Sequence, residues 1–263
     1  MYPILFEIPI FGGLTITTYG AFVTTAFIVA MAYIYYEAKR LGENGDMVLD
    51  LFFWIILAAI VGSRAFYVLT IEPSTLLHDP LAFFKIWRGG LVFHGGLLAG
   101  IFTGVIWVRK YKLSAWKYMD IFAPAIALGH GFGRFGCLMS GCCHGSAVDH
   151  SAWYTIIYPY NPSSFAPAGI SLYATPLMEA GGELLIFAFL ILYKNHKKFN
   201  SQLMSIWMIA YGIVRILVEF LRADSTREFV FGHIFSVAQV TSLCLMIAGI
   251  VLWIYNRRRQ EVI

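Results

Sequence analysis

The sequence carries little charge. Only 13% of its 263 residues are Asp, Glu, Lys or Arg, whereas a soluble domain of this size carries about 25%. Hydrophobic residues make up 59% of the chain and form runs long enough to cross a hydrocarbon core of about 30 Å, which takes roughly 20 residues per helix. The composition therefore excludes a soluble domain and predicts an all-α polytopic membrane protein.

Other features that the sequence lacks indicate how this membrane protein is organised. The chain has no internal repeat, no low-complexity tract and no segment with the composition of a soluble domain. Its first residues lack the basic start of a cleavable signal peptide, and Pro3, Pro9 and Gly12-Gly13 interrupt any helix there. We expect this stretch to lie at the membrane surface before the first span. The prediction is one membrane domain covering residues 1–263.

Seven apolar segments are candidates for membrane-spanning helices. The fourth is the weakest, because it is short and interrupted by glycines. The seven segments are residues 15–37, 47–70, 91–108, 118–138, 176–193, 202–221 and 233–255.

The basic residues are distributed asymmetrically between the loops. Of the 19 Lys and Arg residues, 12 follow the first, third, fifth and seventh spans. Cytoplasmic loops are enriched in Lys and Arg, so we expect an outside N-terminus and a cytoplasmic C-terminus. The net charge of +4 then reflects topology, and no nucleic-acid partner is expected. Residues 139–175, rich in Pro, Ser, Tyr and Asn, are predicted to form a small extracytoplasmic cap.

The stretch 129–145, GHGFGRFGCLMSGCCHG, is the most unusual part of the chain. It places Arg134 among glycines, histidines and cysteines within an otherwise apolar sequence. A guanidinium at membrane depth is costly unless it faces protein, water or an anion, so it indicates a functional site. The glycines allow a backbone or a ligand to approach closely.

The sixth span carries a second polar group. Tyr211, Arg215, Glu219 and Arg222 are spaced by four, four and three residues and so share one helical face. One interpretation is a structural Arg215–Glu219 pair that joins helices. The other is that Arg215 binds an anion while Glu219 holds its planar fork in place, since a guanidinium matches phosphate geometry.

Two further polar residues lie in the second and third spans. His94 is flanked by Gly95-Gly96, which would clear space beside the imidazole; it is either an interfacial hydrogen-bonding group or a general base. Arg64 must face the helix bundle. Two interpretations stay open for Arg64. It could pair with Asp50, Glu179 or another acid, such as Glu183, or it could contact a substrate.

Three cysteines cluster near the end of the fourth span. One interpretation is a zinc site formed by Cys137, Cys142, Cys143 and His144. However, the spacing of these cysteines is not of the CxxC type, and two adjacent cysteines are poorly placed to ligate one ion. Cys137 and Cys142 could form a disulfide if their Cα atoms lie within about 7 Å. Simple packing of small thiols is the third interpretation. Cys244 is expected in the core.

Six motifs together resemble prolipoprotein diacylglyceryl transferase, a bacterial membrane enzyme family that lipidates lipoprotein precursors. The resemblance covers nearly the whole chain. The motifs are Tyr19-Gly20, Gly62-Ser63-Arg64 with Tyr67, WRGGLVFHGG at 87–96, Gly133-Arg134 with Gly145 closing the same segment, Leu177 with Glu179, and Tyr211-Gly212, Arg215, Glu219-Phe220 and Arg222.

The chain also departs from the family pattern. The family signature has asparagine at the positions of Cys137 and Ser140 and glutamate at that of Cys142. The family's HPSQLYE segment is degenerate here, with Tyr173, Pro176 and Met178 in place of its histidine, glutamine and tyrosine. The chain is thus similar to a divergent, cysteine-bearing branch.

The resemblance implies a reaction in the bacterial inner membrane. Its substrates are phosphatidylglycerol and the lipobox cysteine of a prolipoprotein signal peptide; the thiol attacks the glyceryl carbon that bears the phosphate, which gives a thioether and releases glycerol phosphate. No cofactor and no metal are implied.

Roles for individual residues follow from that chemistry. Arg134 and Arg215 would neutralise the phosphate, and His94 would help to form the thiolate, the nucleophilic form of a thiol. Tyr19 and Glu219 would orient these groups. Substrate contacts are expected from Arg134, Arg64, Gly95, Gly96, Gly145 and Tyr211.

Two other classes of function remain open at this point. One is a phospholipid- or peptide-binding membrane protein without catalysis. The other is an extracytoplasmic thiol or metal protein built around Cys137, Cys142 and Cys143. A transporter is disfavoured, because no inverted repeat is evident.

Overall fold

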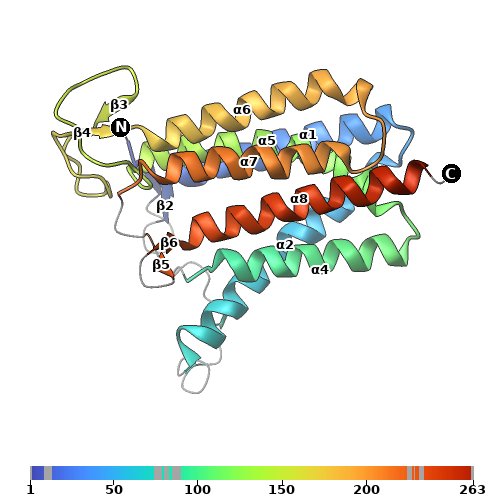
Figure 1. Ribbon diagram of the computed structural model, residues 1–263. Coiled ribbons are helices and arrows are strands. Elements are labelled where there is room, and N and C mark those ends of the chain that lie inside the picture. The colour runs from blue at the N-terminus through green and yellow to red at the C-terminus, as the bar shows by residue number, and fades with distance from the viewer. Residues whose placement is uncertain are drawn as a thin grey trace. The chain divides into compact units, whose positions relative to one another are not determined.

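The computed structural model describes residues 2–8, 14–73, 79, 83–84, 90–223, 227, 229–230 and 234–261. Long helices dominate this part of the chain (Figure 1). They are α1 (Thr18–Arg40), α2 (Gly45–Thr70), α4 (Phe93–Lys110), α5 (Ala115–Ser140), α6 (Thr175–Tyr193), α7 (Gln202–Glu219) and α8 (Val237–Glu261).

The seven helices match the seven predicted spans one for one, which confirms a polytopic helical membrane protein. Six of them, all except α4, are long and apolar enough to cross a membrane by length and composition. The predicted weakness of the fourth span is not seen. α5 runs unbroken for 26 residues through four glycines and Pro124, and half of its most apolar window is buried inside the protein, because neighbouring helices pack on it.

The chain divides into two compact units. The first unit contains residues 1–33 and 119–263, and the second contains residues 34–118. The predicted single membrane domain over residues 1–263 stays a prediction.

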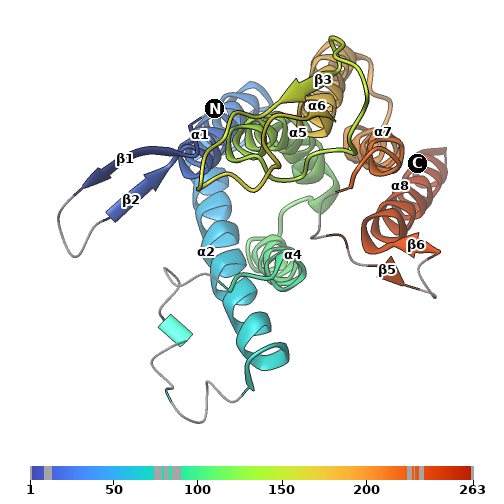
Figure 2. The same ribbon diagram turned by 90° about the vertical axis from the view of Figure 1, so that its left-hand side faces the viewer.

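Small residues allow the helices of the first unit to approach closely. A Cβ added at Gly212 of α7 would lie 2.3 Å from Met246 Cγ of α8, and one added at Gly182 of α6 would lie 2.7 Å from Val214 Cγ1 of α7. In lipid, helices associate through such close packing, since the hydrocarbon provides no hydrophobic driving force. α7 thus lies between α6 and α8, as both views show (Figures 1 and 2).

A buried carboxylate ties α5 to the start of α7. Asp120 of α5 accepts hydrogen bonds from the backbone N–H groups of Ser201, Leu203 and Met204, at 2.9, 2.8 and 3.2 Å, and pairs with Lys197 at 2.9 Å. The first N–H groups of a helix have no partner within the helix. Asp120 therefore acts as an N-cap supplied from another helix.

In the second unit, α2 and α4 pack through paired glycines. Cβ atoms added at Gly95 and Gly62 would lie 2.5 Å from Gly62 O and 2.7 Å from Gly95 O, respectively. At Gly96, an added Cβ would lie 2.4 Å from Ser63 Oγ. The space over Gly95 and Gly96 is thus filled by α2.

In the described part of the chain, three short antiparallel ribbons accompany the helices. β1 (Ile4–Ile8) pairs with β2 (Leu14–Thr17) directly before α1, and this ribbon projects away from the helix in Figure 2. Of the N-terminal stretch expected at the membrane surface, residues 9–13 lie outside the described residues. β5 (Phe229–Val230) pairs with β6 (Phe235–Ser236) before α8.

The predicted cap forms between α5 and α6. β3 (Thr155–Ile157) pairs with β4 (Ser171–Tyr173), and isolated bridges join Ala147 to Leu172 and Tyr158 to Ala168. The burial of the Tyr158 side chain raises its pKa, as expected for a phenol shielded from water. Phe165 N of the cap donates to Ser140 O at 3.2 Å, which ties the cap to the last residue of α5.

Candidate active site

Arg134 is bound by a carboxylate from the facing helix. Its Nη2 lies 2.7 Å from Oε1 of Glu179 on α6, whose side chain is only 2% exposed. The same oxygen lies 3.8 Å from Arg215 Nε and accepts a hydrogen bond of 3.5 Å from the Tyr211 hydroxyl, both on α7. One buried carboxylate of α6 therefore joins side chains of α5 and α7.

His130 supports Arg134 from one turn earlier on α5. Arg134 Nε donates to His130 Nε2 at 3.2 Å, and His130 Nδ1 lies 2.5 Å from Oε1 of the fully buried Glu183. This network requires the neutral tautomer with its proton on Nδ1, which donates to Glu183, while the Nε2 lone pair accepts from Arg134. The other carboxylate oxygen of Glu183 accepts from Trp207 Nε1 at 3.2 Å. His130 is thus a positioning residue for Arg134.

A second carboxylate gathers arginines at the end of α7. Glu219 Oε2 lies 2.8 Å from Arg215 Nη1 and 3.9 Å from Arg222 Nη1, while Arg227 Nε donates to Glu219 Oε1 at 3.1 Å. The Arg215–Glu219 contact lacks hydrogen-bond geometry, and among the described residues Arg215 Nη1 makes no hydrogen bond although it is buried. A buried N–H donor without an acceptor is costly, so this guanidinium is suited to receive an oxygen of a bound anion.

Among the described residues, the network contains more guanidinium groups than carboxylates. Four guanidinium groups face three carboxylates there, and His130 is neutral in this arrangement. They are Arg134, Arg215, Arg222 and Arg227 against Glu179, Glu183 and Glu219. In a low-dielectric site, preorganised donors of this kind stabilise a developing negative charge without further reorganisation.

The remaining candidates of the first unit border this network. Tyr19 packs on Gly136 of α5, whose added Cβ would lie 3.1 Å from the tyrosine ring, and its phenol lies within electrostatic range of Arg134. Gly145 forms a bridge with Arg222, and its N–H donates to Tyr173 O at 3.0 Å. A Cβ at Gly145 would lie 2.7 Å from Leu221 O. Gly145 thus joins the end of the 129–145 stretch to the end of α7.

The candidates of the second unit form their own group. His94 is exposed near the start of α4, with its ring 5.8 Å from that of Phe93. Arg64 Nε donates to Phe83 O at 3.1 Å, and its guanidinium lies 5.4 Å from the centre of the Tyr67 ring. Trp87, part of the same predicted motif, lies outside the described residues. Substrate contacts of Arg64, Gly95 and Gly96 and the role of His94 stay predictions.

Part of the site is not predicted by the sequence motifs. His130 is absent from the predicted site residues, although it stands four residues before Arg134 and therefore on the same helical face. Glu179 and Glu183, predicted as possible acids for Arg64, instead bind Arg134 and His130 of their own unit. Their four-residue spacing was the available signal, since it places both on one face of α6.

The thiols of Cys137, Cys142 and Cys143 are free, so the possible disulfide is not formed, and Cys244 is exposed rather than in the core.

The sequence is similar to those of a known protein family. The family model described as prolipoprotein diacylglyceryl transferase matches residues 3–255. The chain belongs to this family. It is 34% identical over 248 residues to the phosphatidylglycerol–prolipoprotein diacylglyceryl transferase of Finegoldia magna, an alignment that covers 94% of each chain.

Other members of the prolipoprotein diacylglyceryl transferase family align as fully. Phosphatidylglycerol–prolipoprotein diacylglyceryl transferase 2 of Clostridium perfringens is 32% identical over 245 residues, and the alignment covers 93% of each chain. The transferase of Clostridium tetani is 28% identical over 261 residues, with 99% of this chain and 100% of its own length covered. The resemblance found in the motifs is thus confirmed over the full length, despite the cysteines at 137 and 142.

Proposed function

We propose that this chain transfers the diacylglyceryl group of phosphatidylglycerol to a cysteine thiol of a prolipoprotein. The thiol sulfur forms a bond with the glyceryl carbon that bears the phosphate. The carbon–oxygen bond to that phosphate breaks, and glycerol phosphate leaves with the electron pair. The thiol proton passes to a base.

One observation carries the proposal. Arg134 and Arg215 converge on Glu179, and Arg215 retains a buried N–H donor without a hydrogen bond among the described residues. A leaving phosphate needs such donors, and a lipid phosphate reaches them from the end of the helices beside Arg222 and Arg227. In this proposal Arg134 and Arg215 bind the phosphate, Glu219 holds Arg215, and Tyr211 and Tyr19 border the reacting atoms.

The base is assigned to His94. His130 is occupied on both ring nitrogens, by Arg134 and Glu183, and so has no lone pair free for a substrate proton. His94 is exposed, and the described residues form no such network around its imidazole. General bases contribute about 10²- to 10⁴-fold to rates. Replacing His94 by alanine should therefore lower turnover by about that factor, and added imidazole should restore part of it; no loss of turnover would exclude this base.

The finer features of the substrate and location belong to the same proposal. The acceptor cysteine lies in the lipobox of a signal peptide. The protein resides in the bacterial inner membrane with its N-terminus outside and its C-terminus in the cytoplasm. This orientation places the cap and the arginines on the outer side, where a secreted precursor presents its cysteine.

The decisive test is transfer of labelled diacylglyceryl from phosphatidylglycerol to a lipobox peptide in membranes. Wild type, Arg134→Ala and Arg109→Ala are compared at equal amounts of folded protein. Loss of one preorganised donor typically costs about 10²- to 10³-fold in turnover, so Arg134→Ala should fall by at least about 100-fold. Arg109→Ala, at the C-terminal end of α4, should transfer as wild type does. Wild-type transfer by folded Arg134→Ala would refute the site, and no transfer by folded wild type would refute the function.

A further inference from the structure

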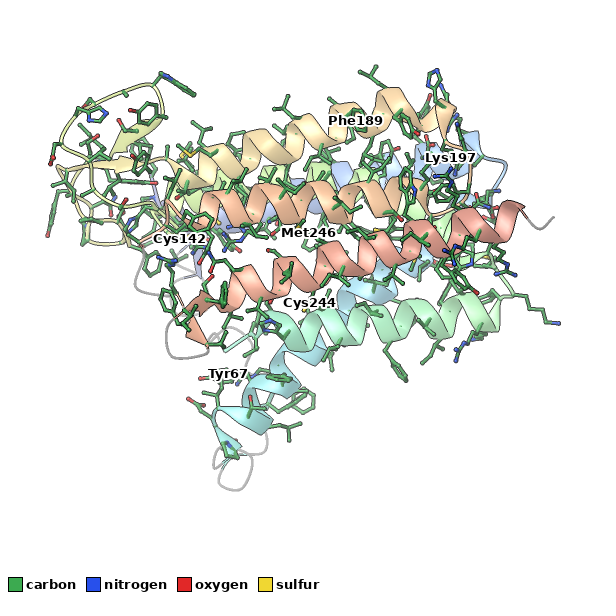
Figure 3. The ribbon with its side chains drawn as sticks, in the orientation of Figure 1. Tyr67, Cys142, Phe189, Lys197, Cys244 and Met246 are labelled. Atoms are coloured by element: carbon green, nitrogen blue, oxygen red, sulfur yellow. The ribbon has the colours of Figure 1, made fainter. Side chains whose placement is uncertain are left out.

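The three cysteines near the end of α5 form a compact thiol cluster. The Sγ atoms of Cys137, Cys142 and Cys143 all lie within 4.8 Å of one another. Cys137 is buried in the last turn of α5, whereas Cys142 and Cys143 follow the helix and are partly exposed. Figure 3 places Cys142 at the end of the first unit where α5 enters the cap, at the opposite end of its helices from Lys197.

The backbone explains how two adjacent cysteines reach the same point. Gly141 has φ +76° and Cys143 has φ +60°, so the chain turns through left-handed conformations on either side of Cys142. A non-glycine residue in this region is strained and persists only where its surroundings impose it; such outliers cluster at functional sites. This turn removes the objection that neighbouring cysteines cannot ligate one ion.

The surroundings hold the turn in place. Cys142 N donates to Cys137 O at 3.2 Å, Phe165 N donates to Ser140 O at 3.2 Å, and Thr175 Oγ1 donates to Cys143 O at 2.6 Å. The cap and the start of α6 thus fix the chain on both sides of the thiols. The cluster is preorganised by three separate segments.

Two guanidinium groups are placed close to the thiols along the chain. Arg134 precedes Cys137 by three residues on α5, and Arg222 forms a bridge with Gly145, two residues after Cys143. Three thiolates around one divalent cation carry a net charge of minus one, which these guanidinium groups would balance. Thiolates prefer soft or borderline ions and discriminate against Mg²⁺ and Ca²⁺.

We propose that Cys137, Cys142 and Cys143 form a three-thiolate site for one thiophilic metal ion, with Zn²⁺ as the expected ion. A Zn–S distance of about 2.3 Å brings tetrahedral sulfurs to about 3.8 Å from one another, so each thiol needs to move by less than about 1 Å. The fourth position would be open to water or to another ligand, as in zinc sites that take part in chemistry. Because Cys137 follows Arg134 by three residues, the ion would lie beside the arginine network.

The test uses the full-length protein in detergent, reduced, freed of reductant under nitrogen, and confirmed to have four free thiols. Co²⁺ is added in steps as a spectroscopic probe, and Zn²⁺ is then added in competition. We expect thiolate-to-cobalt charge-transfer absorbance that saturates at one ion per chain and disappears on addition of Zn²⁺. This assay does not depend on transferase activity.

Variants separate the cluster from other binding. Cys143→Ser and Cys142→Ser should each weaken Co²⁺ affinity by at least about tenfold, a loss seen even for residues that only support metal ligands. Cys244→Ser, on the exposed face of α8, should bind as wild type does. Absence of the charge-transfer band in reduced wild type would overturn the proposal, as would equal binding by folded Cys143→Ser.

Discussion

Glu179 is the residue on which the arginine network depends. Its Oε1 lies 2.7 Å from Arg134 Nη2 and 3.8 Å from Arg215 Nε, and the Tyr211 hydroxyl donates to it. A charged side chain at the centre of a bilayer costs about 2.5–3.5 kcal/mol on insertion scales. The buried carboxylate offsets part of this cost by pairing directly with Arg134, and it lies at a longer distance beside Arg215, which is 2.8 Å from Glu219.

Replacing Glu179 with glutamine should lower transfer by about 100-fold. The amide keeps the shape but loses the charge that holds both arginines, and a displacement of about 1 Å in such a site can cost about 100-fold. The transfer assay measures this effect, with Asp149→Asn, an exposed acid of the cap, as the matched control. Equal rates for Glu179→Gln and the control would show that the carboxylate does not position the arginines.

His130 makes a second residue-scale prediction. Glutamine at position 130 can still offer an oxygen to Arg134 and an N–H to Glu183, whereas leucine can do neither. We therefore expect His130→Leu to reduce transfer strongly and His130→Gln to retain a larger share. Rates at saturating lipid and peptide, with folding checked by thermal unfolding, test this order. The reverse order would contradict a positioning role.

At the scale of elements, helix ends and helix contacts are set by single residues from neighbouring helices. Asp120 of α5 caps α7, and glycines of α2 and α4 bring these two helices together. These contacts place α7, which carries Tyr211 and Arg215, and α4, which carries His94. Substitutions at such positions should mainly lower the stability of the protein and should affect the reaction less directly.

Asp120→Ala should lower the free energy of unfolding by about 1–3 kcal/mol. Loss of an N-cap costs about 0.5–2 kcal/mol, and the buried N–H groups and Lys197 would also be left without their acceptor. Thermal unfolding in detergent should show a lower Tm, while Asp149→Ala should keep the wild-type value. An unchanged Tm for Asp120→Ala would contradict the cap.

Gly95→Ala should destabilise the protein, whereas Gly181→Ala should not. The new Cβ at position 95 would lie 2.4 Å from Phe66 Cβ and 2.5 Å from Gly62 O, while that at position 181 meets nothing within 4 Å. Overpacking typically costs about 1–3 kcal/mol, and Gly to Ala in an open helix position can gain up to about 1 kcal/mol. The two Tm values, measured side by side, should move in opposite directions; a shared increase would contradict the tight α2–α4 contact.

At the scale of the whole molecule, charge sets orientation. Clusters such as Lys39 and Arg40, Arg109 and Lys110, and Arg258 and Arg259 occur in the last turns of α1, α4 and α8. Cytoplasmic loops carry an excess of such residues. The proposed orientation therefore places these helix ends in the cytoplasm and the cap outside.

A membrane-impermeant thiol reagent tests this orientation. In a variant whose four native cysteines are replaced by serine, Asn161→Cys in the cap should be labelled in intact cells. Glu43→Cys, between α1 and α2, should be labelled only after the cells are permeabilised. The opposite pattern would invert the proposed topology.

Much of the architecture followed from the sequence by itself. The seven helices correspond to the seven apolar segments, because the hydrocarbon core requires about 20 apolar residues per crossing. Such a run of apolar residues is visible in a local stretch of the sequence. The rarity of charged residues at membrane depth also predicts Arg134, Arg215 and Glu219 as site residues. The structure joins them in one network, and their roles stay predictions. The spacing of Tyr211, Arg215 and Glu219 also predicted that they share one face of α7.

Only the tertiary structure decided which groups are partners. Glu179 and Glu183 bind Arg134 and His130 because α6 packs on α5, and no spacing within one helix specifies that contact. Likewise, the sequence argued against joint ligation by Cys142 and Cys143, but left-handed φ angles at Gly141 and Cys143 bring their thiols together with Cys137. Periodicity follows from local backbone geometry, whereas partner choice and turn conformation depend on residues far away in the chain that hold the backbone in place.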